Sequence, residues 1–157
     1  SVIGFPLGAT TTDIKIAETE FCLDNGADEI DMVINIGEAK QGNWIYVENE
    51  IRALSNLCHE KGAILKVIFE TCYLDQLEII SACKASIKGG GDYVKTSTGF
   101  GEGGATIDDV KLMAATVGGD CKVKASGGIR DKDAALAMID AGASRIGTSS
   151  GIIIVSE

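Results

Sequence analysis

The sequence contains little histidine, a single proline and no long hydrophobic run. His59 is its one histidine, and none of the five cysteines forms a CxxC pair, so the residue spacings typical of zinc sites are missing. The longest apolar stretches, among them residues 152–155, fall far below the roughly 20 residues of a membrane span. We therefore expect no metal and no membrane partner, and we expect residues 152–155 to form a short strand or a buried turn. An odd number of cysteines without pairing motifs is typical of reduced thiols in a cytoplasmic protein.

Basic residues are outnumbered by acidic ones. The chain has 14 lysines and arginines against 23 aspartates and glutamates, which gives a formal net charge of −9 at pH 7. No basic run or stripe reverses this sign locally, so the chain on average repels nucleic acid, and we expect no nucleic-acid partner. An anionic ligand must therefore be held by a focused site.

Short apolar strands and amphipathic helices alternate along the whole chain. In residues 44–60, Val47, Ile51, Leu54 and Cys58 recur at helical spacings of three and four, which indicates a helix that buries one face. No linker or change of composition interrupts the series, so we expect a single domain over residues 1–157 with six βα units. The expected strands are residues 2–5, 29–36, 64–70, 93–96, 122–125 and 144–148.

The polarity of these strands favours a barrel over an open doubly wound sheet. Central strands of a doubly wound sheet have helices on both faces and are apolar throughout. Here apolar and polar residues alternate, with Ile30 and Met32 on one face of the second strand and Asp31 on the other. The interior of a barrel provides an enclosed second face of this kind, so we expect an α/β fold of the TIM (β/α)8 barrel family. An α+β sheet with one solvated face is the alternative.

Ionisable side chains gather on the strand face away from the helices. Lys95 and Lys124 would end adjacent strands, and two neighbouring ammonium groups disfavour double protonation, which leaves one free amine near neutral pH. A free amine attacks a carbonyl to form a Schiff base, and a nearby carboxylate such as Asp31 can move protons. A structural ion pair is the alternative reading of any one lysine, and of Glu70 in particular. The whole set is Asp31, Lys66, Glu70, Lys95, Lys122 and Lys124.

Glycine-containing turns follow the last two strands, as Ser-Gly-Gly-Ile-Arg at residues 126–130 and Gly-Thr-Ser-Ser-Gly at residues 147–151. In phosphate-using barrels, backbone N–H groups of the loops after strands 7 and 8 hold the phosphate. Thr-Ser-Thr-Gly at residues 96–99 could add hydroxyl donors. These turns predict a phosphate site at one end of the sheet.

Six segments resemble the deoxyribose-phosphate aldolase family, in the family's order and over essentially the whole chain. The most specific are Lys-Thr-Ser-Thr-Gly at residues 95–99 and Lys-Ala-Ser-Gly-Gly-Ile-Arg at residues 124–130. The resemblance implies a cytoplasmic class I aldolase on a TIM barrel, without metal or cofactor, that reversibly cleaves 2-deoxy-D-ribose 5-phosphate to D-glyceraldehyde 3-phosphate and acetaldehyde. The similar segments are residues 2–8, 29–37, 65–71, 93–100, 123–130 and 145–151.

The resemblance also implies roles for individual residues. By motif position, Lys95 is similar to the family's Schiff-base lysine, Lys124 to the lysine that lowers its pKa, and Asp31 to the proton-relay acid. Some members of the family carry a lysine where this chain has Phe100. The positions that match the family's phosphate-binding loops are Thr98, Gly127, Gly128, Arg130, Gly147, Ser149 and Ser150.

The N-terminal part departs from the family's pattern. Residues 2–8 match the family's third strand, so the two βα units that normally precede it are missing, and six units cannot close an eight-stranded barrel in the usual way. Exposed strand edges invite pairing with another chain. Either the chain is a piece of a longer protein or two chains complete each other, and we expect a homo-oligomer, a dimer or larger. Two other functions stay open. One is a different phosphate-binding barrel enzyme, such as an isomerase or a transaldolase; the other is a truncated, catalytically impaired, self-associating fragment that retains a phosphate site.

Overall fold

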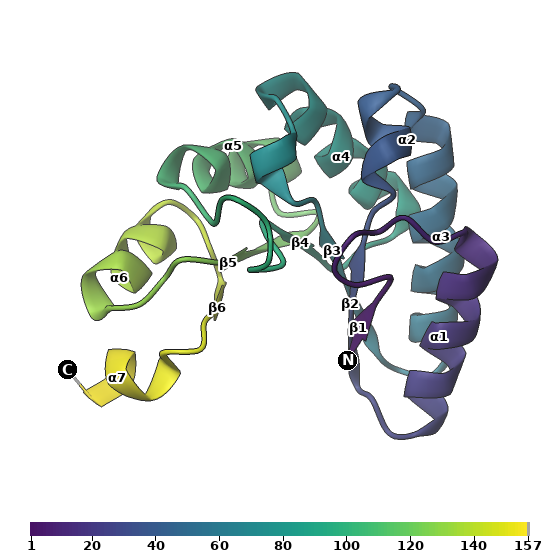
Figure 1. Cartoon of the computed structure of the whole chain (residues 1–157), viewed down its shortest axis with the longest axis horizontal. Helices are drawn as coiled ribbons and strands as arrows, with labels where there is room; N and C mark the ends of the chain where they lie inside the picture. Colours follow the sequence, from purple (N-terminus) through teal and green to yellow (C-terminus); the bar gives the residue numbers. More distant parts are fainter. Residues whose placement is uncertain (157) are drawn as a thin grey trace.

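A computed structural model describes residues 1–156, which form six parallel strands connected by helices. Figure 1 shows the strands at the inside of an arc and the helices along its outside. The elements in chain order are β1 (Val2–Ile3), α1 (Thr12–Asp24), β2 (Glu29–Val33), α2 (Ile36–Lys40), α3 (Trp44–Glu60), β3 (Ile64–Ile68), the 3₁₀ turn η1 (Thr71–Tyr73), α4 (Gln76–Gly89), β4 (Tyr93–Lys95), α5 (Ile107–Val117), β5 (Lys122–Ser126), α6 (Lys132–Asp140), β6 (Arg145–Gly147) and α7 (Gly151–Ser156).

The order of the strands in the sheet determines the architecture. Neighbours follow the sequence order β1-β2-β3-β4-β5-β6, and every neighbouring pair is parallel. A doubly wound sheet reverses its strand order near the centre, whereas a uniform order with crossovers of one hand keeps all helices on one side. The sheet is therefore half of a barrel, which confirms the expected fold family, and Figure 1 shows β1 and β6 near opposite ends of the arc.

The hydrophobic core lies between the outer face of the sheet and the helices. Ile30 and Met32 of β2, for example, are fully buried, and Ile51 of α3 belongs to the same core cluster. The alternation seen in the sequence is confirmed, because the residues between these apolar positions, such as Asp31, face the inside of the arc. No helix within residues 1–156 has the length and the apolar character that are needed to cross a membrane.

The strand ends differ from the sequence-based expectations, since β1 stops at Ile3 and β3 at Ile68 instead of at residues 5 and 70. Two further differences have a local cause. The strand expected at residues 29–36 ends at Val33, because Asn35 caps α2 by accepting a hydrogen bond from the backbone N–H of Glu38 at 3.2 Å. Residues 152–155 lie in α7 and form neither a strand nor a buried turn, and Ile152 is 84% exposed. That helix is held by local hydrogen bonds, since the N–H of Ile154 donates to the carbonyl of Ser150 at 3.1 Å. Among the described residues, β6 is therefore the last strand of the sheet.

A fully buried ion pair joins α1 and α3 behind the sheet. Lys15 Nζ lies 2.8 Å from Glu50 Oε1, and both side chains are 0% exposed. Lys15 also donates to the carbonyl of Val33 at 2.8 Å, and Glu50 accepts from the N–H of Asn35 at 3.2 Å. Burial lowers the pKa of Lys15 and raises that of Glu50, and their mutual attraction opposes both shifts. The pair thus fixes the carboxyl end of β2, the strand that carries Asp31.

We expect Lys15→Met to destabilise the fold by about 3–5 kcal/mol, because it leaves the Glu50 carboxylate buried without its cation. The double variant Lys15→Met/Glu50→Gln should recover part of this loss, since the amide still accepts from Asn35 and carries no charge. Urea unfolding followed by the fluorescence of Trp44 measures both. A double variant that is no more stable than the single one would contradict this account.

Candidate active site

Three lysines converge on one carboxylate inside the arc. Lys95 Nζ and Lys124 Nζ donate to the same oxygen of Asp31, Oδ2, at 2.7 and 2.8 Å. Lys66 Nζ donates to the other oxygen, Oδ1, at 2.7 Å. The Asp31 side chain is 10% exposed, and those of Lys95 and Lys124 are 8% and 15% exposed. The structure thus brings together the three residues that the sequence predicts for the amine chemistry.

The strand register produces this convergence. Lys95 of β4 lies level with Lys124 of β5, so the two side chains leave adjacent parallel strands side by side. Asp31 of β2 lies level with Lys66 of β3. Adjacent strands are about 4.8 Å apart, so long lysine side chains from three strands can reach one carboxylate on a fourth.

The electrostatics of the cluster combine burial with charge pairing. Burial is the largest effect on Asp31 and opposes its ionisation, but the hydrogen bonds from Lys124, Lys66 and Lys95 outweigh it and hold its pKa well below the usual range. The pKa of Lys95 is lowered, first by burial and then by the charges of Lys124 and Lys66, while Asp31 opposes the shift. The expectation of an amine with a depressed pKa agrees with this direction, with burial as its main cause.

A second set of ion pairs lies next to this cluster. Lys66 Nζ is also 2.7 Å from Glu29 Oε2, and that carboxylate accepts a hydrogen bond from Arg145 Nη1 of β6 at 2.5 Å. The pairing spans the inside of the arc from β2 to β6. The sequence pattern assigns no role to Lys66, and the structure shows that it bridges the two carboxylates and orients Asp31.

A cavity of about 550 Å³ opens beside Lys95 at the carboxyl ends of β4, β5 and β6. The predicted phosphate-loop residues Thr98 and Arg130 line it, but Ser150 does not; its N–H instead donates to Thr148 Oγ1 at 2.9 Å. Ser126 and Thr148 also line the cavity; both lie in the glycine-containing turns predicted to hold phosphate, although neither was named as a phosphate-binding position. The complete lining is Lys95, Thr98, Gly99, Phe100, Ser126, Gly127, Gly128, Ile129, Arg130, Gly147, Thr148 and Ser149.

Two glycines allow the backbone to pack closely around this cavity. A Cβ on Gly104 would lie 2.3 Å from the carbonyl oxygen of Gly127, so the loops after β4 and β5 can meet only without a side chain at this point. A Cβ on Gly147 would lie 3.1 Å from Cε of Lys124. Glycine at position 147 therefore leaves room for the Lys124 side chain to extend toward Asp31.

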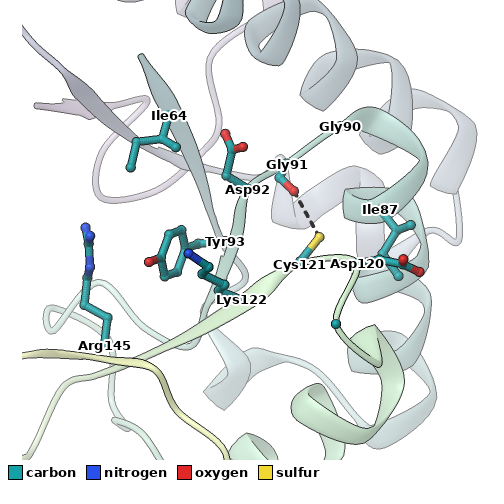
Figure 2. A pocket seen from close by; sticks show the side chains of 11 residues that line it. Ile64, Ile87, Gly90, Gly91, Asp92, Tyr93, Asp120, Cys121, Lys122 and Arg145 are labelled. Atoms are coloured by element: carbon teal, nitrogen blue, oxygen red, sulfur yellow. Dashed lines mark hydrogen bonds between the residues drawn. The ribbon is translucent and has the colours of Figure 1, made fainter. Parts of the chain in front are cut away.

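A second hollow, of about 480 Å³, lies at the opposite ends of β4 and β5. Figure 2 shows Lys122 and Arg145 beside the ring of Tyr93, with Lys122 Nζ 5.6 Å and Arg145 Cζ 4.8 Å from the ring centroid. The nearby Cys121 thiol donates to the carbonyl of Gly91 at 3.0 Å, and burial raises its pKa to about 11. A protonated, hydrogen-bonded thiol is a poor nucleophile, so this hollow does not offer Cys121 as a reactive group.

The family model and the similar proteins indicate the same family. The family model "DeoC/LacD family aldolase" matches residues 2–156. A deoxyribose-phosphate aldolase of Thermococcus gammatolerans is 59% identical over 155 residues, which cover 99% of this chain and 69% of that protein.

Solved structures agree with these matches. The aldolase QR15 superposes with a TM-score of 0.93 at 44% identity and covers 99% of this chain, which corresponds to 69% of QR15. A deoxyribose phosphate aldolase from Aeropyrum pernix, described as having a unique tetrameric structure, superposes with a TM-score of 0.92 at 35% identity, over 99% of this chain and 65% of that one. The six strands seen here thus correspond to a large part of complete aldolase barrels.

We expect Asp31→Asn to lower the free energy of unfolding by about 3–5 kcal/mol at pH 7, because three ammonium groups lose their shared carboxylate. The pKa of Asp31 is depressed in the fold, so its stabilisation is present above the unfolded value of about 3.9 and is lost progressively as the pH falls from there through the lower folded value. Urea unfolding from pH 7 to pH 3 should show the wild type approaching the variant. Asp24→Asn, which breaks the exposed pair with Lys61 at 3.0 Å, is the control and should change little; a constant difference at all pH values would contradict the prediction.

Proposed function

We propose that this chain, which belongs to the DeoC/LacD family of aldolases, acts through Lys95 as a Schiff-base aldolase on a phosphorylated deoxy sugar. The observation that carries the proposal is the pair Lys95 and Lys124 on one oxygen of Asp31, next to the cavity. The choice of substrate is supported by the names of the similar proteins, which are deoxyribose-phosphate aldolases. The proposed reaction is the reversible cleavage of 2-deoxy-D-ribose 5-phosphate to D-glyceraldehyde 3-phosphate and acetaldehyde, a carbon–carbon lyase reaction of deoxyribonucleotide catabolism.

The first step needs a neutral amine in contact with the cavity. Lys95 lines the cavity, and its pKa is lowered by burial and by neighbouring cations, which favours the neutral form. Its nitrogen adds to the aldehyde carbon of the open-chain sugar, and water leaves to give an iminium ion. Lys124 lies beside this nitrogen on the same oxygen of Asp31, and its charge lowers the pKa of Lys95.

The second step breaks the bond between C2 and C3 of the sugar. A base removes the proton of the C3 hydroxyl, the three-carbon fragment leaves as glyceraldehyde 3-phosphate, and the bonding electrons pass to the iminium to give an enamine. Protonation of the enamine at C2 and hydrolysis of the new iminium release acetaldehyde and the free lysine. Asp31 is the proposed proton carrier, acting through water, because its carboxylate accepts hydrogen bonds from both Lys95 and Lys124.

The phosphate end of the substrate fits the other end of the cavity. Gly127 and Gly128 have φ angles of 87° and 79°, a backbone conformation that glycine adopts readily and that can expose N–H groups to an anion. Arg130 is the cation of this loop that lines the cavity. Where some relatives carry lysine, Phe100 instead packs edge-on against Phe5, with ring centroids 5.5 Å apart, and supplies no charge.

A second candidate function is a self-associating, catalytically impaired half-barrel that binds phosphate. It is favoured by the two sheet edges, since β1 pairs only with β2 and β6 only with β5 among the described residues. Unpaired edges are templates for association, and a tetrameric relative is known. Sedimentation equilibrium gives the oligomeric state, and the trapping experiment below separates an active oligomer from an inactive one.

We expect acetaldehyde and borohydride to attach one ethyl group to Lys95. Reduction converts the Schiff base into a stable secondary amine, so peptide mapping of the protein by mass spectrometry identifies the lysine. Lys95→Met should abolish the labelling, whereas Lys61→Met, at an exposed lysine, should leave it intact. Labelling at Lys124 alone would reverse the assignment of the two lysines, and a folded protein that binds phosphate but is never labelled would support the second candidate.

We expect Lys124→Gln to move the pH midpoint of Lys95 labelling upward by about one unit. The substitution removes a cation that lowers the pKa of Lys95, and it leaves more of the Asp31 charge to stabilise the ammonium form. The measurement is the initial rate of acetaldehyde labelling with cyanoborohydride as a function of pH. Lys122→Gln is the matched control on the same strand, because Lys122 is exposed and lies over Tyr93; an equal shift in both variants would contradict the role of Lys124.

A further inference from the structure

Glu70 is a buried carboxylate whose charge the proposed chemistry does not use. Glu70 is 2% exposed, and within residues 1–156 its carboxylate makes no salt bridge to a lysine, arginine or histidine. The Glu70 side chain instead accepts two hydrogen bonds from one residue in the loop after the neighbouring strand, β4. Oε1 accepts from the backbone N–H of Thr98 at 3.1 Å, and Oε2 accepts from the Thr98 hydroxyl.

The backbone at Glu70 has an unusual conformation. Its φ and ψ are 56° and 65°, and it is the one non-glycine residue with positive φ among those described, a left-handed conformation that costs free energy for a residue with a Cβ. The N–H groups of Phe69 and Thr71 donate to the successive carbonyls of Lys95 and Thr96, both at 3.0 Å. Just past the end of β3, a two-residue advance along this segment is therefore paired with a one-residue advance along the neighbouring one. The extra residue, Glu70, resembles the one in a β-bulge, a feature that can redirect a side chain.

The target of this side chain is the loop that borders the cavity. Thr98 lines the cavity, and its hydroxyl oxygen also accepts from the N–H of Phe100 at 3.0 Å. The same loop passes over the carboxylate, since a Cβ on Gly101 would lie 3.1 Å from Cδ of Glu70. The carboxylate therefore holds Thr98 through both backbone and side chain, and Thr98 in turn holds the turn that leads to Phe100.

We propose that Glu70 is a positioning residue that fixes the loop of residues 97–101 in the shape needed to bind the substrate's phosphate. Glu70 does not line the cavity beside Lys95, so it acts through Thr98 and not on the substrate. Because the strained backbone aims a fully desolvated carboxylate at a loop N–H and a hydroxyl, the loop is ordered before the ligand arrives, which reduces the entropic cost of binding. This inference rests on the proposed phosphate site.

The test compares Glu70→Gly, Glu70→Ala and Glu70→Gln. Glycine tolerates the left-handed backbone, so Glu70→Gly deletes the hydrogen bonds without adding strain, whereas Glu70→Ala deletes them and keeps the unfavourable φ. Glutamine keeps an acceptor for the Thr98 N–H and should rescue most of the function. The readouts are the affinity for inorganic phosphate by calorimetry, the hydrogen exchange of the Thr98 amide, and the rate of acetaldehyde trapping at Lys95.

We expect Glu70→Gly to weaken phosphate binding by about tenfold, which is the loss of a hydrogen bond to a charged group, and to speed exchange at Thr98. Trapping at Lys95 should stay within roughly twofold, because independent sites contribute additively. Thr98→Val should weaken phosphate binding too, and the double variant should lose less than the sum of the two.

Several outcomes would overturn the inference. One is wild-type phosphate affinity in Glu70→Gly, and another is an equal loss of trapping and of phosphate binding, which would place Glu70 at the amine end. Unfolding of both Glu70→Gly and Glu70→Gln would show a role in the whole fold instead of the loop. If the wild type neither traps acetaldehyde nor binds phosphate, the proposed function fails, while exchange at Thr98 still reports whether Glu70 holds the loop.

Discussion

The Asp31 carboxylate is the interaction on which the inside of this half-barrel depends. Three lysines from three neighbouring strands are taken out of water within hydrogen-bond distance of it, and without a counter-ion such a group of charges would be strongly destabilising. One carboxylate cannot neutralise three ammonium groups. The local excess of positive charge is eased by Glu29, and it acts together with burial, the larger cause, to lower the pKa of Lys95.

The same arrangement reconciles an acidic protein with the anionic substrate that we propose. The net charge of −9 repels anions at a distance, but the lysines and Arg130 gather at the inside and at one end of the sheet. The cavity beside Lys95 therefore differs in sign from the protein as a whole. The two ends of this cavity are built differently, since the end at Lys95 stands on strands and the proposed phosphate end stands on loops that need glycine to pack together. A loop site requires separate support to be as well ordered as a strand site, and Glu70 is placed to give it.

Much of the fold follows from the sequence alone. The alternation of Ile30, Asp31 and Met32 gives the two faces of a strand, and the helical spacing of Val47, Ile51 and Leu54 gives the buried side of α3, because such periods express burial directly. The ends of the strands were predicted poorly. Asn35 stops β2 by capping a helix of five residues that carries almost no periodic signal, and α7 forms where an apolar run had suggested a strand or a buried turn.

The sequence by itself determined that lysines and an aspartate share the inner face of a βα series, since residue identity and strand period decide which face a side chain occupies. It also determined the glycine-rich loops and the family. Only the tertiary structure decided that Lys66 bridges Asp31 and Glu29, that Arg145 reaches Glu29 across the arc, that Ser150 turns away from the cavity, and that Glu70 binds a loop instead of a lysine. The physical reason is that, apart from the local turn at Ser150, these contacts join residues 28 to 116 positions apart. Their geometry depends on register, on the curvature of the sheet and on one left-handed residue, none of which gives a periodic pattern in the sequence.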